Sequence, residues 1–295
     1  MEEIVYLNGS LVPRSEARVS VSDHGFLYGY GLFETMRAYN GNIFLLELHI
    51  DRLRGSAAAM GLGAALDKID IAGACRETLQ ANNLEDARMR VTVTGGEVDA
   101  FPWADRGSSP TVVITARPYE APAEKYGQGY KIGIASVRHC RESRLLHIKA
   151  TSYLTSVFAR IEAAAQGLDE AILLNDDGYI AEGGSSNVFF VRSGRLVTPS
   201  VGSGILPGIT RGLVIELAEG LDIVVTEGTV GIAIIRQCEE AFLTNSVLGI
   251  MPMTSASDKS GRTVLVGSGK PGPVTQRLMV AYQERVDKET GIAPE

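Results

Sequence analysis

Apolar residues recur at strand and helix spacings along the first part of the chain. The runs IVYL and SLVP flank Asn8-Gly9, a dipeptide that favours a two-residue hairpin because both residues tolerate positive φ. Apolar positions four and three residues apart predict a helix over 46–60. A second helix is predicted from residue 71 to an end near Asn82 and Asn83. Between the hairpin and the first helix, closely spaced glycines favour tight turns before an alternating strand through Phe33.

Two further runs, RMRVTVT and TVVITARP, carry β-branched residues at alternate positions and are expected to be strands, joined by a loop over 96–110. A proline and glycines then interrupt the periodic pattern at 119–128, which favours a linker there. We therefore expect an N-terminal domain over 1–118 and a larger C-terminal domain over 129–295. The mixture of strands and helices in both predicts an α/β protein of two domains.

The second half continues the same mixture and contains no internal repeat. YKIGIASVRH predicts a strand, TSYLTSVFARIEAAAQGL a helix and EAILLNDDGYIAEG a pair of strands. NVFFVRSGRLVTPS predicts a strand, a Ser193-Gly194 turn and another strand, and the helix that follows LPG is expected to end at Gly220. EEAFLTNSVLGIMPM predicts a buried strand that ends in a polar turn, and a hairpin and one helix complete the chain.

Composition narrows the class of protein. At 295 residues the chain can form two ordinary cores, and 45% hydrophobic with 21% charged residues is typical of a globular protein. A net charge of -7 argues against a nucleic-acid partner. Three separated cysteines without a CxxC pair suggest neither disulfides nor a metal site. No apolar run has the length of a membrane span or signal peptide, so we expect a cytoplasmic protein.

The chemistry-bearing stretch runs from HIKATSYL, with Lys149, to YIAEGGSSN, with Glu182. A lysine flanked by apolar residues loses hydration, which favours the free amine that attacks a carbonyl. The helix and strand pair between the two residues are expected to bring them to one site. Either residue alone is more often a solvated surface group, so the interpretation needs a third element.

The segment LPGITR supplies that element. Pro207 and Gly208 turn the chain directly into an amphipathic helix, so the unpaired amides of Ile209 and Thr210, with the Thr210 hydroxyl, are expected to face a phosphate-sized anion. An amine, a carboxylate and a phosphate site together indicate pyridoxal 5'-phosphate as cofactor.

Seven blocks in order resemble the class IV, fold-type IV, pyridoxal-phosphate enzymes: YLNGSLVP, DHGFLYGYGLFETMRAYNG, HIDRL, HIKATSYL, AEGGSSNVFFV, LPGITR and TNSVLGIMP. That family comprises branched-chain and D-amino-acid aminotransferases, (R)-selective amine aminotransferases and 4-amino-4-deoxychorismate lyases. The resemblance implies a smaller N-terminal α/β domain, a larger C-terminal α/β pseudo-barrel domain, and a homodimer with the active site at the interface.

The resemblance also implies residue roles. Lys149 would hold the cofactor as a Schiff base and move the proton at the substrate α-carbon, and Glu182 would keep the pyridine nitrogen protonated. Arg52, in HIDRL, matches the arginine that binds the phosphate. The full set of expected cofactor-binding residues is Arg52, Tyr153, Glu182, Ser185, Ser186, Asn187, Leu206, Gly208, Ile209, Thr210, Asn245 and Ser246. The expected substrate-binding residues are Tyr28, Tyr30, Phe33, Thr35, Arg88, Arg90 and Val247.

Two of these expectations have a geometric basis. Arg88 and Arg90 lie two residues apart on a strand and share a face, where two like charges are costly unless solvated or paired with an anion. This pair indicates either a wet sheet face or a clamp for a substrate carboxylate. Tyr153 follows Lys149 by four residues, so a helix that included both would place the phenol beside the amine, where it could face the cofactor's ring oxygen or simply pack in the core.

The reaction stays open between three interpretations. An aminotransferase would act on a small amino acid or amine with a 2-oxo acid acceptor, and Glu182 favours it. Thr35 and the Thr244-Asn245-Ser246 turn resemble the lyases, which release pyruvate and 4-aminobenzoate. Gly95 and Gly96 stand where D-amino-acid aminotransferases carry an Arg-x-His carboxylate trap, and Tyr30 replaces a common aspartate. A binding protein without chemistry is disfavoured because Lys149 is intact.

Overall fold

The computed structural model describes residues 2–97, 109–258 and 260–291, and these fold into two compact units. The first comprises the chain up to Glu120, the segment Ile148–Ser152 and the residues from Val286 onward. The second comprises Ala121–His147 and Tyr153–Arg285. The chain first passes between the units at Glu120, and the segment expected as a linker contains a short helix, α5 (Ala123–Gln128).

The first unit is built on an antiparallel sheet whose strand order is β2-β1-β6-β5-β3-β4. Its strands are β1 Ile4–Leu7, β2 Ser10–Pro13, β3 Gly31–Tyr39, β4 Asn42–Ile43, β5 Ala87–Thr94 and β6 Thr111–Pro118. Asn8 and Gly9 adopt φ values of 49° and 98° and close the β1–β2 hairpin, as the sequence predicted. Most of the loop expected over 96–110 lies outside the described residues.

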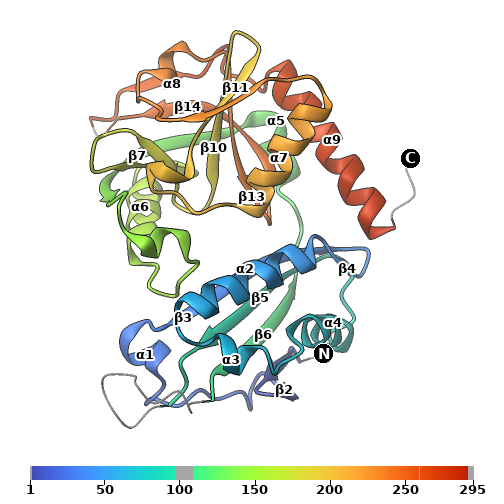
Figure 1. Cartoon of the computed structure of the whole chain (residues 1–295). Coiled ribbons are helices and arrows are strands. Elements are labelled where there is room, and N and C mark those ends of the chain that lie inside the picture. The colour runs from blue at the N-terminus through green and yellow to red at the C-terminus, as the bar shows by residue number, and fades with distance from the viewer. Residues whose placement is uncertain (1, 98–108, 259, 292–295) are drawn as a thin grey trace. The chain divides into compact units, whose positions relative to one another are not determined.

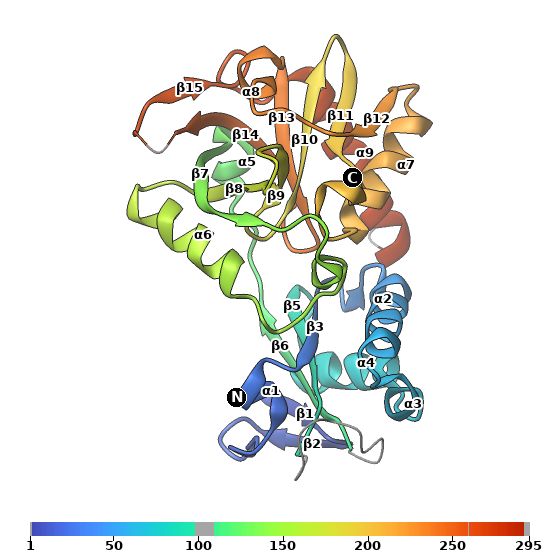
Figure 2. The same cartoon turned by 60° about the vertical axis from the view of Figure 1, so that its left-hand side comes forward.

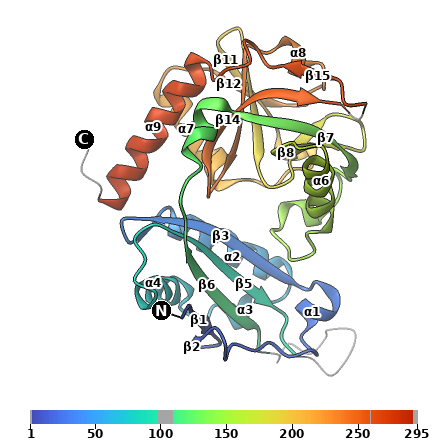
Figure 3. The same ribbon diagram turned by 180° about the vertical axis from the view of Figure 1, so that it is seen from behind.

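Helices cover one face of this sheet, and their apolar stripes explain why. The helices α2 (Leu46–Ala59), α3 (Gly63–Leu66) and α4 (Ile71–Ala81) bury residues such as Leu53 and Leu79 against inward-facing strand residues such as Met36 and Met89. Figures 1 and 3 show α2 on one side of β3, β5 and β6. A five-residue helix, α1 (His24–Tyr28), forms where only turns were expected, with Asp23 accepting a hydrogen bond from Gly25 N.

The opposite face of the first sheet carries polar and charged residues. Phe33, Thr35 and Arg37 alternate on β3, and the register pairs Thr35 with Arg90 and Arg37 with Arg88 on β5. Arg88 and Arg90 therefore share a face, as predicted. Lys149, from the segment Ile148–Ser152, also lies on this face, next to Phe33.

The second unit is built on a mixed sheet of nine strands within the described residues, ordered β12-β11-β10-β13-β14-β7-β8-β9 with β15 beside β14. The strands β8 (Glu170–Asn175), β13 (Glu240–Asn245) and β14 (Gly249–Ser257) are buried at nearly every position, so the sheet is covered on both sides. The remaining strands are β7 Tyr130–His139, β9 Ile180–Gly183, β10 Asn187–Arg192, β11 Arg195–Pro199, β12 Val225–Gly228 and β15 Thr263–Leu265.

Besides α5, the second unit contains α6 (Leu154–Ala165), α7 (Ile209–Gly220), α8 (Ile234–Gln237) and the part of α9 (Pro273–Thr290) up to Arg285, with single 3-10 turns at Arg144–His147 and Val201–Ser203. Figure 2 shows α6 beside β7 and β8. The end of α7 at Gly220 and the Ser193-Gly194 turn match the sequence predictions. Among the described residues, no helix combines the length and the apolar character that a membrane span requires.

One local prediction is wrong. The helix expected from Thr151 begins only at Leu154, and Lys149 lies outside it. Residues 149–151 instead pair with β3: Lys149 O accepts from Phe33 N at 2.9 Å, and Thr151 N donates to Gly31 O at 2.9 Å. Lys149 and Tyr153 therefore do not share a helix face, because pairing with a distant strand overrides the local helical pattern.

Candidate active site

Lys149 lies half-buried beside an aromatic ring of the first unit. Its Nζ lies 4.7 Å from the centre of the Phe33 ring, within the range of a cation–π contact. The backbone of Lys149 pairs with β3, which fixes the position of its Cα. The Thr151 hydroxyl donates to Gly29 O at 2.9 Å and holds the same segment two residues later. The amine is thus presented from an ordered strand-like segment rather than from a flexible loop.

Arg90 contacts the same ring. Its guanidinium carbon lies 3.9 Å from the centre of Phe33, and its Nε donates to Thr92 Oγ1 at 3.1 Å. Arg88 is more exposed on the same face and has no such contact with Phe33 among the interactions described. Of the two arginines predicted as a carboxylate clamp, the structure brings Arg90 to the ring that Lys149 also contacts.

Arg52 is held by a buried acid that sequence reasoning did not single out. Arg52 Nε and one terminal nitrogen each donate to a Glu34 oxygen at 2.7 Å, and His49 Nδ1 lies 2.7 Å from Glu34 Oε2. Burial acts to raise the pKa of Glu34, but hydrogen bonds from His49 and Arg52 lower it to about 2. Two features of the sequence could have indicated this cluster. They are an acid at an inward-facing strand position and a histidine three residues before the arginine on α2.

Replacing Glu34 with glutamine is expected to destabilise the protein at neutral pH by about 3 kcal/mol, because it removes the buried negative charge opposite Arg52 and one of the two acceptor oxygens. The pKa of Glu34 is lowered on folding from 4.5 to about 2, so the charged form contributes stability that is fully present above pH 4.5. That stability is lost as the pH falls from 4.5 towards 2. Urea unfolding at several pH values checks this, since the difference between wild type and variant should shrink across that window.

The predicted substrate tyrosines have different surroundings. Tyr28, on α1, is exposed. Tyr30 donates its hydroxyl hydrogen to Met60 O at the end of α2, and burial raises the pKa of that phenol. Thr35 lies half-buried on the same strand face as Phe33. Roles for these three residues in substrate binding stay predictions.

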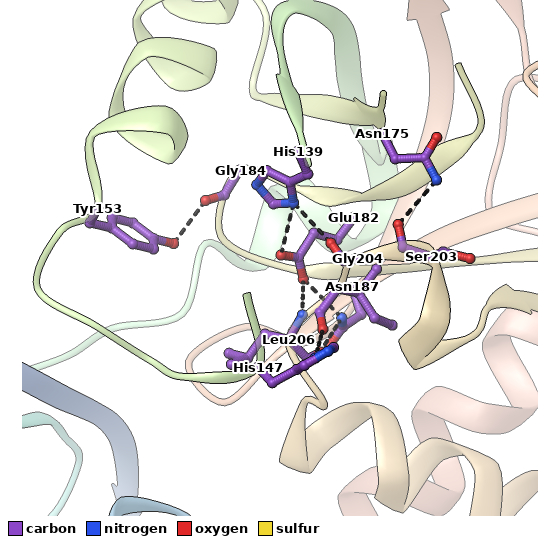
Figure 4. Close-up of polar contacts among 11 residues, drawn as sticks. His139, His147, Tyr153, Asn175, Glu182, Gly184, Asn187, Ser203, Gly204 and Leu206 are labelled. Atoms are coloured by element: carbon purple, nitrogen blue, oxygen red, sulfur yellow. Dashed lines mark hydrogen bonds and ion pairs between the residues drawn. The ribbon is translucent and has the colours of Figure 1, made fainter. Parts of the chain in front are cut away.

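The carboxylate of Glu182 is held by donors of the second unit. Glu182 Oε2 accepts from Leu206 N at 3.1 Å and from Asn187 Nδ2 at 3.2 Å, and the same Asn187 nitrogen donates to Leu206 O at 3.0 Å. Figure 4 shows these contacts around the carboxylate. Hydrogen bonds to an ionised carboxylate stabilise its charge, so Leu206 and Asn187 favour the form that a protonated ring nitrogen requires.

The turn after Glu182 is fixed by other groups. Ser185 Oγ donates to Glu170 Oε2 at 2.7 Å, and Gly183 N donates to Ser186 O at 2.6 Å. Tyr153 donates to Gly184 O at 2.8 Å, and burial raises the pKa of that phenol. Ser185 and Tyr153 therefore stabilise the turn through hydrogen bonds. Their contact with a cofactor stays a prediction.

The start of α7 fits a phosphate group. Gly208 is the N-cap residue of the helix and has no side chain with which to cap the first-turn amides. A Cβ at Gly208 would lie 2.0 Å from Asn187 Oδ1, so only glycine allows this close approach. Thr210 is buried in the first turn. Amides and a hydroxyl at the positive end of a twelve-residue helix are the donors that a phosphate needs.

The β13–β14 turn is the second segment predicted to bind the cofactor. Asn245 Oδ1 accepts from Val247 N at 3.0 Å and from Leu248 N at 2.8 Å, which closes the turn. Ser246 and Val247 are half-buried within it. Just before the turn, Thr244 Oγ1 is buried and has no hydrogen-bond partner among the described residues. This segment thus offers hydroxyl groups, and a role in binding stays a prediction.

Comparisons with known proteins decide the family. A model of the amino-transferase class IV family matches residues 31–256. The chain belongs to the class IV aminotransferase family. It is 37% identical to a putative branched-chain-amino-acid aminotransferase of Methanocaldococcus jannaschii, over 95% of each chain. It is 33% identical to the aminodeoxychorismate lyase of Bacillus subtilis, over 96% of this chain and 94% of that protein.

The fold agrees with this assignment. The structure of the branched-chain aminotransferase of Escherichia coli matches with a TM-score of 0.85 and 30% sequence identity, over 98% of this chain and 96% of that one. These matches confirm the fold class, the family and pyridoxal phosphate as the cofactor of this class IV enzyme, all of which the sequence motifs had predicted.

Proposed function

We propose that this class IV enzyme transfers an amino group between a small amino acid and a 2-oxo acid, and that Arg90 binds a carboxylate of both. The observation that carries the proposal is the shared contact of the Lys149 amine and the Arg90 guanidinium with the Phe33 ring. An amine able to form a covalent bond thus lies on the same aromatic ring as a planar cation suited to a carboxylate. Amino acids and 2-oxo acids carry that carboxylate, whereas simple amines do not.

Other residues of this chain have separate roles in the proposed reaction. Bound pyridoxal phosphate supplies an electron-withdrawing ring that accepts the electron pair released at the substrate α-carbon. Lys149 takes the proton from that carbon and returns it to the cofactor side. Glu182, which accepts hydrogen bonds from Leu206 N and Asn187 Nδ2, keeps the ring nitrogen protonated. The first-turn amides of α7 are proposed to bind the phosphate, and Arg52, which donates to Glu34, is proposed to bind it as well.

A lyase that releases pyruvate and 4-aminobenzoate is the second candidate. It is favoured by Thr35, on the same strand face as Phe33, and by the similarity to the lyase of Bacillus subtilis. Both reactions use Lys149 and Glu182 in their first steps, so these residues do not discriminate between them.

The half-reaction with amino donors distinguishes the aminotransferase from the lyase. The protein with bound cofactor is mixed with D-alanine, L-leucine, L-glutamate or an (R)-amine alone, and the visible absorption band is followed. An aminotransferase loses that band with its own donor and regains it with the matching 2-oxo acid. Absence of any response, together with formation of 4-aminobenzoate from aminodeoxychorismate, would assign the lyase instead.

Substitution of Arg90 tests the carboxylate site. Arg90→Leu is expected to raise the KM for the amino acid by roughly 10- to 100-fold, because a charged hydrogen-bond partner of the carboxylate is lost. Arg88→Leu, on the same strand face but away from Phe33, should change KM by less than about threefold. Steady-state kinetics of both variants check this, and equal effects would show that the two arginines act as the pair first predicted.

We also propose that the chain forms a homodimer. One stripe of α6 carries four exposed apolar residues at helical spacing, namely Leu154, Val157, Phe158 and Ile161. A contiguous exposed apolar stripe is typical of a protein interface. A second copy of the chain would cover it.

The role of this stripe in dimer formation can be tested by introducing one charged residue. Ile161→Asp is expected to convert the dimer to monomer at micromolar concentration, because an unpaired carboxylate would be buried in the interface. Val280→Asp on α9 is the matched control, since this valine is similarly exposed. Sedimentation analysis of both variants measures the mass, and a dimer that survives Ile161→Asp would place the interface elsewhere.

A further inference from the structure

Four consecutive backbone carbonyls just before α7 each accept a hydrogen bond from a side chain of a different element. The donors are Asn175 Nδ2 to Ser203 O at 3.2 Å, His139 Nδ1 to Gly204 O at 3.0 Å, His147 Nδ1 to Ile205 O at 3.3 Å and Asn187 Nδ2 to Leu206 O at 3.0 Å. Figure 4 shows the donors around this segment. Residues 203–206 are thus held along one edge, and the backbone N–H of Leu206 is left directed at Glu182.

His139 differs from the other three donors because it also approaches the second oxygen of Glu182. It is the last residue of β7 and is only 5% exposed. Its Nδ1 lies 3.8 Å from Glu182 Oε1, which is too long for a hydrogen bond but close enough for electrostatic attraction. The ring therefore faces both the segment that holds one carboxylate oxygen and the other oxygen itself.

The hydrogen bond fixes the tautomer of the ring. A carbonyl oxygen only accepts, so Nδ1 must carry the hydrogen that it shares with Gly204 O. Burial lowers the pKa of His139, and the bond to Gly204 only partly offsets this, which favours the neutral ring. In that form His139 is the Nδ1–H imidazole and adds no positive charge beside Glu182.

We propose that His139 is a positioning residue for Glu182, because its Nδ1–H holds Gly204 and so fixes the segment whose Leu206 N–H binds the carboxylate. This inference rests on the proposed function, in which Glu182 faces the ring nitrogen of the cofactor. An imidazolium at this position would instead compete with that ring nitrogen for the carboxylate. A neutral donor orients the acid without neutralising it.

Substituting His139 with two amide side chains of different length distinguishes this positioning role from simple packing. His139→Asn keeps a donor at the position of Nδ1, whereas His139→Gln moves the donor one bond further out, to the position of Nε2. His139→Leu removes it. We expect the asparagine variant to bind pyridoxal phosphate within about threefold of wild type, and the glutamine and leucine variants to bind it roughly tenfold or more weakly. The ¹⁵N chemical shifts of the wild-type imidazole should report the Nδ1–H tautomer.

The outcomes are distinct. An Nε2–H tautomer in the wild type, or equal affinities of the asparagine and glutamine variants beside tight wild-type binding, would overturn the role of His139 and leave the proposed function intact. A wild-type protein that takes up no pyridoxal phosphate would overturn the proposed function and this inference with it. Thermal unfolding of each variant separates weak binding from loss of the fold.

Discussion

Replacing Lys149 with alanine is expected to reduce turnover by at least about 10³-fold, because the same amine forms the covalent bond to the cofactor and moves the substrate proton. The backbone of residue 149 pairs with β3 through its carbonyl, which alanine retains. The fold should therefore survive. Lys149→Arg is the matched control, since it keeps the positive charge beside Phe33 but cannot form the covalent bond.

Covalent attachment can be measured without turnover. Borohydride treatment of the wild-type protein with bound cofactor should add the mass of the reduced cofactor to the peptide that contains Lys149, and neither variant should gain it. Thermal unfolding within a few degrees of wild type would show that both variants fold. Turnover of Lys149→Ala within tenfold of wild type, or trapped mass on another lysine, would refute the assignment.

The elements that were predicted correctly depend on neighbours in the sequence. Asn8-Gly9 closes a hairpin because those two residues tolerate positive φ, and α4 ends at Ala81, next to the asparagines where its end was predicted. Buried strands such as β8 and β13 were recognisable from their continuous apolar runs. In these regions local preference and tertiary packing favour the same structure.

The errors arise where distant segments compete with local preference. Residues next to Lys149 have a helical pattern, but Ala150 pairs with Leu32 on β3, more than a hundred residues earlier in the chain, and the helix starts later. The Glu34–His49–Arg52 cluster joins a strand to a helix, and the contact of His139 with Gly204 joins the end of β7 to the segment before α7. The family motifs indicated Arg52 and Glu182, but the residues that hold them are identified only by the folded structure.

Replacing Glu182 with glutamine is expected to slow the half-reaction with the amino donor by roughly 10²- to 10⁴-fold. Glutamine keeps the shape of the side chain, and its carbonyl oxygen can still accept from Leu206 N. It carries no charge, however, so it cannot hold a proton on the ring nitrogen, and the ring becomes a poorer acceptor of electrons. Stopped-flow absorbance of the half-reaction measures this rate directly.

Glu170→Gln is the matched control for that experiment. Glu170 is also a buried acid of the second unit, but it accepts from Ser185 Oγ and Ala171 N behind the turn. Its substitution should lower the free energy of unfolding by about 1–3 kcal/mol while leaving the half-reaction rate within about tenfold of wild type. If both variants slow the half-reaction equally, the effect of Glu182 lies in the shape of the turn. If only Glu182→Gln does, its charge acts on the reaction itself.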